Sequence, residues 1–274
     1  MSTTATSANS LRLDSIPKQT LFGIETLAIT MPELLDLADR AIEQRCQLNI
    51  GQLSGPTLVR IHRDADMCRS LLAANIFVAD GAGVLVASRI LRRPLPTRLA
   101  GIDIMYGLMD RANQHSHRVF LLGAEQWVVD KVHERWTQEY PNAKIVGKRN
   151  GYFTSDQEAE VAQQVKQSGA DILFVAITSP TKEHFLATWG AEVGVPILHG
   201  VGGSFDVVAG KVTRAPELAQ RLSLEWAYRI YQEPKRLWRR VGMANLLFVG
   251  LVGWEVAANL VRPEGANWAK AKGQ

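Results

Sequence analysis

Short apolar runs alternate with longer amphipathic segments through the middle of the chain. Near-continuous runs of Val, Ile, Leu and Phe that are separated by helices are typical of a parallel sheet covered on both faces. We therefore expect an α/β fold with a parallel sheet flanked by helices. The pattern predicts strands over residues 76–79, 118–122, 143–146, 171–177 and 195–198, and helices over residues 31–47, 82–91, 102–112, 125–140, 156–168 and 180–189.

Small and polar residues follow these predicted strands directly. In open α/β sheets, ligands bind at the carboxyl ends of the strands. Each turn alone is explained by a tight strand-to-helix connection, and no glycine cluster has the spacing of a dinucleotide fingerprint. Several such turns on one sheet edge together favour a site for a nucleotide or a nucleotide-sugar. The turns contain Asp80-Gly81, Gly123-Ala124, Thr178-Ser179-Pro180 and His199-Gly200-Val201-Gly202-Gly203.

An acid and a base lie close to one of these strand ends. Asp80 follows the strand over 76–79, and Arg98 precedes the helix over 102–112. A carboxylate can accept a proton from a substrate and an arginine can hold an anion. On the residues alone, Asp80 is equally well explained as the N-cap of the helix over 82–91. Asp103, in the first turn of its helix, is expected to complement only the helix dipole.

The predicted helix over 180–189 begins with a characteristic pattern. Ser179 is expected to be its N-cap, with Pro180 at the first helical position. Glu183 in the first turn complements the helix dipole, whereas the positive charge of Lys182 is unfavourable there. Lys182 is therefore expected to serve an anionic ligand. His199 is expected to be a core residue whose hydrogen bonds are satisfied.

Length and composition predict one large domain with an appendage. The chain has 274 residues, 46% of them hydrophobic, and only two cysteines, which indicates no disulfide framework and a reducing compartment. We expect a disordered tail over residues 1–20, a core over 21–211 and an appendage over 212–274. The first ten residues lack the pattern of a signal peptide.

The net charge of +4 is concentrated in the appendage. Residues 212–240 contain seven basic and three acidic side chains, so this segment alone carries a surplus of four. A neutral domain with one basic end is expected to meet an anionic partner there. No motif typical of nucleic-acid binding supports DNA or RNA as that partner.

An apolar stretch follows the basic segment. Residues 243–261 contain a single charged residue, Glu255, and are long enough to span a bilayer. Glu255, Asn245 and Asn259 argue against a spanning helix. A helix lying in the membrane interface and a helix that covers the core or another subunit both remain open.

Several ordered motifs between residues 48 and 248 make the chain resemble the WecG/TagA/CpsF glycosyltransferases, glycosyltransferase family 26. The motifs are FVADGAG at 77–83, PLPTRLAGID at 94–103, FLLGA at 120–124, SPTKE at 179–183, VGGSFD at 201–206, RAPE at 214–217, LEWAYR at 224–229 and EPKRL at 233–237.

The resemblance implies a Rossmann-like domain with a basic helical C-terminal appendage. It also implies an inverting, metal-independent enzyme without a cofactor. This enzyme moves a sugar from UDP to a polyprenyl-diphosphate-linked saccharide for cell-surface polymer assembly. Its expected place is the cytoplasmic side of the bacterial membrane, peripherally bound, and a homo-oligomer is compatible with it.

The same resemblance assigns roles to individual residues. Asp80 matches the proposed general base, and Arg98 matches an arginine of the active pocket. Arg229, Arg236 and Arg239 match appendage arginines that close over the nucleotide diphosphate. The expected nucleotide-sugar-binding residues are Gln52, Ser54, Gly123, Lys182, Glu183, Gly202, Arg229, Arg236 and Arg239.

Three of these positions depart from the family pattern. Gln52 and Ser54 stand where the family has Thr-x-Asn, and Lys182 stands where it has Gln. Because these positions lie near the sugar in the family, the donor and acceptor sugars stay open. The alternative is a binding module of the same fold that binds a nucleotide or an anionic lipid without turnover.

Overall fold

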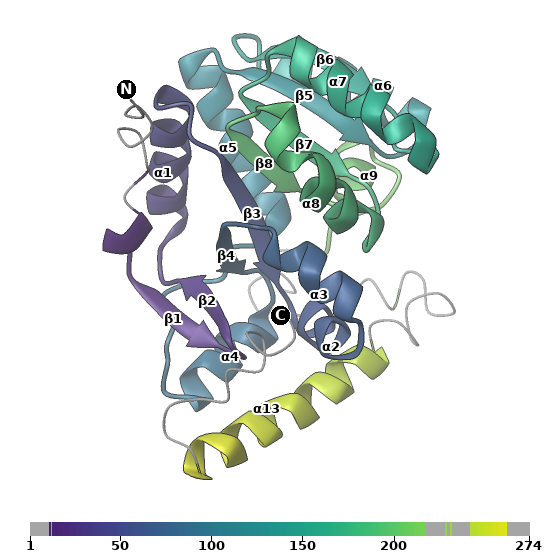
Figure 1. Ribbon diagram of the computed structural model, residues 1–274. Helices are drawn as coiled ribbons and strands as arrows, with labels where there is room; N and C mark the ends of the chain where they lie inside the picture. The colour runs from purple at the N-terminus through teal and green to yellow at the C-terminus, as the bar shows by residue number, and fades with distance from the viewer. Residues whose placement is uncertain (1–10, 12, 217–227, 229–230, 232–241, 262–274) are drawn as a thin grey trace, which may run out of the picture.

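A six-stranded parallel sheet forms the centre of the protein (Figure 1). This computed structural model describes residue 11, residues 13–216, residues 228 and 231, and residues 242–261. Every paired strand runs parallel to its neighbour, in the order β4-β3-β8-β7-β5-β6. The predicted α/β fold with a Rossmann-like sheet is thereby confirmed. The strands are β3 Leu48–Leu53, β4 Ile76–Ala79, β5 Arg118–Gly123, β6 Lys144–Arg149, β7 Ile172–Ala176 and β8 Ile197–Gly200.

Helices cover both faces of this sheet (Figure 1). Each predicted helix is present, with its ends shifted by a few residues. The α-helices are α1 Met31–Glu43, α2 Gly55–Arg63, α3 Ala65–Leu72, α4 Ala82–Ile90, α5 Gly101–His115, α6 Gln126–Glu139, α7 Glu158–Ser168, α8 Thr181–Val193, α9 Ser204–Val208 and α13 Met243–Val261. Short 3-10 turns occur at η1 Leu13–Ser15 and η2 Ser155–Gln157.

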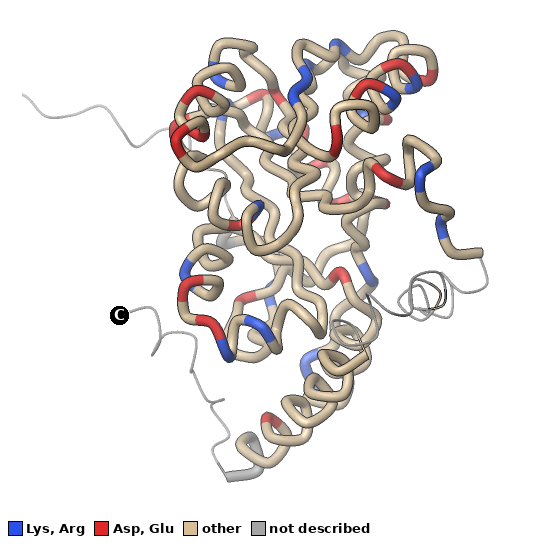
Figure 2. Tube along the Cα trace, turned by 90° about the vertical axis from the view of Figure 1, so that its right-hand side faces the viewer, with Lys and Arg blue, Asp and Glu red and all other residues tan. Residues whose placement is uncertain are grey.

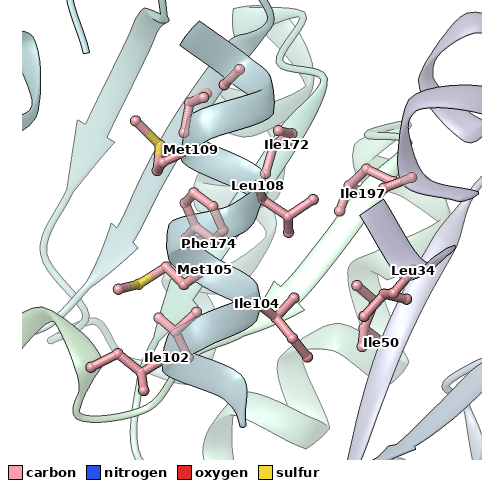
Figure 3. Packing of buried hydrophobic residues seen from close by; sticks show 14 of the residues in the cluster. Leu34, Ile50, Ile102, Ile104, Met105, Leu108, Met109, Ile172, Phe174 and Ile197 are labelled. Atoms are coloured by element: carbon pink, nitrogen blue, oxygen red, sulfur yellow. The ribbon is translucent and has the colours of Figure 1, made fainter. Parts of the chain in front are cut away.

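The apolar runs are continuous because both faces of the sheet are buried. Successive side chains of a strand point to opposite faces. In β7, Phe174 belongs to the core cluster with α1, α5 and α6, whereas Leu173 and Val175 belong to the cluster with α7 and α8. Figure 3 shows Phe174 beside Met105 and Leu108 of α5. The core thus lies on both faces of the sheet, between the sheet and two helical layers.

Strand β3 is absent from the pattern of apolar runs because polar and small residues interrupt it. Gly51 and Gln52 lie within it, and position 51 must be a glycine because Phe77 of the neighbouring strand β4 fills the adjacent space. A Cβ at position 51 would lie 2.5 Å from the ring of Phe77. Helices α2, α3 and α9 also went unpredicted, and the predicted helix over 31–47 ends at Glu43. Arg45, just after it, has a positive φ of 53°.

A small antiparallel hairpin precedes the sheet. Its strands are β1 Lys18–Leu21 and β2 Ile24–Leu27, joined by Phe22 and Gly23 with positive φ angles. The predicted disordered tail over 1–20 therefore overlaps strand β1 and the 3-10 turn η1. Residues 1–10 and residue 12 lie outside the described residues.

Helix α13 packs along α2 and against the cluster formed by α2, α3, α4 and the hairpin. Its Phe248 is 5% exposed and meets the ring of Phe22, with ring centroids 5.7 Å apart. Space for Phe248 exists because residues 55 and 83 are glycines. A Cβ at Gly55 or Gly83 would lie 3.0 or 3.1 Å from the Phe248 ring. Of the two readings of residues 243–261, the core-covering helix describes this inner face.

The inner face of α13 also buries a carboxyl group. Glu255 is 1% exposed, and neither of its carboxyl oxygens has a hydrogen-bond partner among the described residues. Burial raises the pKa of Glu255 above its ordinary value, an effect that the charge of Arg93 partly offsets. A carboxylate here is costly because it gives up water without gaining a donor.

Replacing Glu255 with Gln is expected to stabilise the protein by about 1 kcal/mol or more near pH 8. Because the folded-state pKa is raised, wild-type stability is fully present below the ordinary carboxyl pKa. It falls as the pH rises through the raised value. The gain of Glu255→Gln should therefore shrink to nothing near pH 4. Urea unfolding of both proteins across this range measures it, with the exposed Glu192→Gln as the matched control. Equal gains at pH 4 and pH 8 would contradict the assignment.

Candidate functional site

A cavity of about 210 Å³ lies between the carboxyl ends of β3, β4 and β8 and helices α2, α3 and α8. We call it the acid cavity. Five of the predicted site residues line it, and they come from segments far apart in the sequence. These residues are Gln52, Ser54, Asp80, Lys182 and Glu183.

Asp80 leaves the end of β4 and reaches the start of helix α5. Its Oδ1 accepts a hydrogen bond of 3.0 Å from the backbone N–H of Gly101, the first residue of α5. The alternative reading of Asp80 as a cap of α4 is wrong. The N-cap of α4 is Gly81, with no side-chain capping bond. The cap that Asp80 supplies belongs to α5, and it orients the carboxylate at the wall of the cavity.

Gln52 and His199 form a buried network behind this carboxylate. The Nε2 of Gln52 donates to the carbonyl of Gly200 over 3.0 Å and lies 3.4 Å from Nδ1 of His199. The Nε2 of His199 lies 2.9 Å from the carbonyl oxygen of Gly101. This pattern fits a neutral imidazole that donates from Nε2 and accepts at Nδ1. Burial lowers the pKa of His199 to about 4, which agrees with the neutral form.

The network fixes the geometry of the sheet edge. Gly101 must lack a side chain, because a Cβ there would lie 2.6 Å from Nε2 of Gln52. The prediction of His199 as a satisfied core residue is confirmed. Gln52 lines the cavity while its amide nitrogen ties β3 to β8. Through His199, which contacts the carbonyl oxygen of Gly101, Gln52 also helps to position the start of α5, the helix that Asp80 caps.

A partly buried ion pair also lines the acid cavity. The Nζ of Lys182 lies 3.3 Å from Oε1 of Glu183, and Glu183 is buried. Its Oε2 has no hydrogen-bond partner among the described residues. The stem of Lys182 crosses Gly200, where a Cβ would lie 2.7 Å from its Cδ. Glu183 therefore does more than complement the helix dipole, because it holds the ammonium in the cavity.

The start of α8 differs from its prediction. The helix begins at Thr181, and Pro180, not Ser179, occupies its N-cap position after a cis peptide bond. The hydroxyl of Ser179 instead accepts a hydrogen bond of 3.0 Å from Arg60 of α2. Ser54, expected at the sugar, caps α2 by accepting from the N–H of Thr57 over 3.3 Å.

Arg98 lies outside the lining of the acid cavity, beside the first turn of α5. Its guanidinium is 3.9 Å from Asp103, and Arg214 also pairs with that carboxylate. The role expected for Asp103, complementing the helix dipole alone, is therefore incomplete. Leu99 donates to the carbonyl of Ala79 over 2.8 Å, which brings this segment alongside the end of β4. Asp103 thus connects Arg98 to the first base of the basic segment.

The two predicted glycine sites are not brought into the acid cavity. Gly123 ends β5, two strands away from β8, with a φ of 125°. A Cβ there would lie 2.5 Å from the backbone of Ala176, so close strand approach explains this glycine. Gly202 has a φ of 52° and follows β8. A phosphate contact at either glycine stays a prediction.

The appendage residues Arg229, Arg236 and Arg239 lie outside the described residues.

Within the described ranges, no group of three His, Cys, Asp or Glu side chains is arranged to hold a metal ion. None of the described helices is long and apolar enough to cross a membrane.

The fold is an α/β fold with a parallel sheet, and the acid cavity lies at the carboxyl edge of that sheet. Residues 19–261 match the glycosyl transferase WecG/TagA/CpsF family, and the chain therefore belongs to this family. The predicted resemblance and the predicted class, a glycosyltransferase, are confirmed.

Two relatives carry the same name, N-acetylglucosaminyldiphosphoundecaprenol N-acetyl-beta-D-mannosaminyltransferase. The protein of Bacillus spizizenii is 39% identical over 171 residues, which cover 62% of this chain and 65% of the relative. The protein of Bacillus subtilis is 33% identical over 224 residues, which cover 81% of this chain and 86% of the relative. The chain thus spans less than two thirds of the first relative's length and most of the second's.

Proposed function

We propose that this protein moves a sugar from a UDP-sugar to a polyprenyl-diphosphate-linked saccharide, with inversion and without a metal, in cell-surface polymer assembly. The observation that carries the proposal is the Asp80 carboxylate, oriented by the N–H of Gly101 at the wall of the acid cavity. The names of the two relatives support a lipid-linked acceptor and N-acetylmannosaminyl transfer.

The mechanism follows from the side chains of the cavity. As the acceptor hydroxyl attacks the anomeric carbon, Asp80 takes its proton, and the bond to the UDP oxygen breaks. Arginine forks can neutralise the departing diphosphate, since they bind phosphate oxygens in pairs. Arg98 and the appendage residues Arg229, Arg236 and Arg239 are proposed for this task. Lys182, whose charge is balanced by Glu183, provides an ammonium donor within the cavity.

We further propose peripheral binding to the cytoplasmic face of the membrane through α13. Its outer face exposes Met243, Leu246, Val249 and Trp254. Figure 2 shows this helix as an almost unbroken uncharged segment. A helix whose exposed apolar side chains lie in the membrane interface suits a substrate whose lipid stays in the bilayer.

A donor panel tests the proposed function. The full chain is incubated with UDP-sugars, UDP-N-acetylmannosamine among them, and N-acetylglucosaminyl-diphospho-polyprenol in detergent. We expect one donor to give a product that is longer by one sugar and unaffected by EDTA. Nucleotide binding without product for every donor would instead identify the binding module. Loss of product in EDTA, restored by Mg²⁺ or Mn²⁺, would contradict metal independence.

A further inference from the structure

A second cavity, of about 390 Å³, lies between α2, the start of α3 and the first turns of α13. We call it the α2–α13 groove. Its volume is within the range of small-molecule sites, roughly 300–1,000 Å³. The proposed function and the expected site residues assign no role to it. Its lining residues are Pro56, Thr57, Val59, Arg60, Arg63, Asp64, Met67, Ser179, Met243, Ala244 and Leu247.

The groove and the acid cavity are neighbours. Thr57 and Ser179 line both of them. The hydrogen bond from Arg60 to the hydroxyl of Ser179 lies at this boundary. A ligand that occupies the groove can therefore extend its next group toward Asp80.

The α2 side of the groove is basic. Among the described residues, neither Arg60 nor Arg63 forms an ion pair with a carboxylate. The acid in the lining, Asp64, is used as the N-cap of α3, where it accepts from the N–H of Met67 over 3.0 Å. Two arginines one turn apart on one helix provide paired donors for phosphate oxygens. An anionic group is therefore the expected occupant of this side.

The α13 side of the groove is apolar and leads outward. Met243, Ala244 and Leu247 line it. Leu246 and Val249 continue the apolar surface of the same helix and are exposed. An anion that also carries a long hydrocarbon chain satisfies both sides, because the chain can leave the groove along α13.

We propose that the α2–α13 groove binds the diphosphate and the first isoprene units of the acceptor lipid. Arg60 and Arg63 hold the diphosphate, and Met243, Ala244 and Leu247 contact the isoprenoid. The proposal rests on the proposed function, because the spatial order matches the order of such an acceptor. The acid cavity receives its sugar, the arginines its diphosphate and α13 its lipid.

Binding of farnesyl diphosphate to the full chain, measured by calorimetry, tests the groove without turnover. We expect Arg63→Gln to weaken binding about tenfold, since one charge-assisted contact is lost. Arg60→Gln should weaken it at least as much. Ala244→Trp, which fills the apolar side, should weaken it as well. The matched control is Arg69→Gln on α3, whose guanidinium is exposed and pairs with Asp66; it should bind like wild type.

Several results would overturn the site. The first is that wild type does not bind farnesyl diphosphate. The second is that both Arg60→Gln and Arg63→Gln bind it with wild-type affinity. The third is that phosphatidylglycerol vesicles displace bound farnesyl diphosphate as well as free farnesyl diphosphate does. Farnesol and inorganic pyrophosphate should each bind more weakly than farnesyl diphosphate, because each fills one side only.

Transfer assays separate this site from the proposed function. We expect Arg63→Gln to raise the KM for the lipid-linked acceptor about tenfold and to leave the KM for the UDP-sugar unchanged. Unchanged acceptor KM in an active Arg63→Gln protein would reject the groove and keep the transferase. Tight farnesyl diphosphate binding that Arg63→Gln weakens, in a protein inactive with every donor, would support the groove and reject the transferase.

Discussion

Replacement of Asp80 with Asn is expected to lower turnover by about 10²–10⁴-fold, the range for loss of a general base. Asn keeps an oxygen that can accept from the N–H of Gly101, so the cap of α5 survives. The affinity for the UDP-sugar and the free energy of unfolding should therefore stay close to wild type. The measurement is kcat at saturating donor and acceptor, together with urea unfolding of the same protein.

Asp80→Ala separates the two uses of this carboxylate. Alanine removes the proton acceptor and also the cap of α5, which costs about 1 kcal/mol of stability. Both variants should lose turnover alike, whereas only Asp80→Ala should lose stability. Wild-type turnover of Asp80→Asn would show that Asp80 serves α5 alone and that the base is elsewhere.

Phe248→Ala is expected to destabilise the protein by about 3–5 kcal/mol. Its ring fills the space above Gly55 and Gly83, at the first turns of α2 and α4. Alanine would leave a cavity between α13 and the core and would loosen α13. Urea unfolding followed by tryptophan fluorescence measures the change.

Leu246→Ala is the matched control on the same helix. Leu246 is 71% exposed, so this change should shift stability by less than about 0.5 kcal/mol. A similar small shift for Phe248→Ala would mean that α13 is not held against the core. Because α13 covers the core, removal of residues 212–274 is expected to cost core stability as well as turnover.

The parts of the fold that could be predicted are those whose signal is local. The strands and their carboxyl-end turns follow from apolar runs, since burial on both faces requires them. Strand β3 could not be found this way, because contacts with neighbouring strands explain Gly51 and Gln52, and these two residues interrupt its apolar run. Gly51 makes room for Phe77, and Gln52 reaches β8. Such requirements are set by residues distant in the chain.

The candidate site was predictable to the same extent. Asp80 could be located at a strand end, and the family resemblance supplied its proposed role. Its bond to Gly101, 21 positions further on, could not be read from the local pattern, which explained Asp80 equally well as a cap of α4. Gly123 was grouped with the site because it ends a strand. The strand order, however, places its strand β5 two positions from β8, the nearest strand that lines the acid cavity. Strand ends alone do not reveal which strands are neighbours.

The pairing of β3 with β8 has a consequence for how the protein is made. Gln52 and Gly200 meet across this pair although they are 148 positions apart in the chain. Pairings of such long sequence separation form slowly, because a large loop must close before they contribute. During synthesis, the edge of β3 that pairs with β8 stays unpaired until β8 has left the ribosome. The acid cavity therefore forms only late, and a nascent chain should be inactive and prone to aggregate until then.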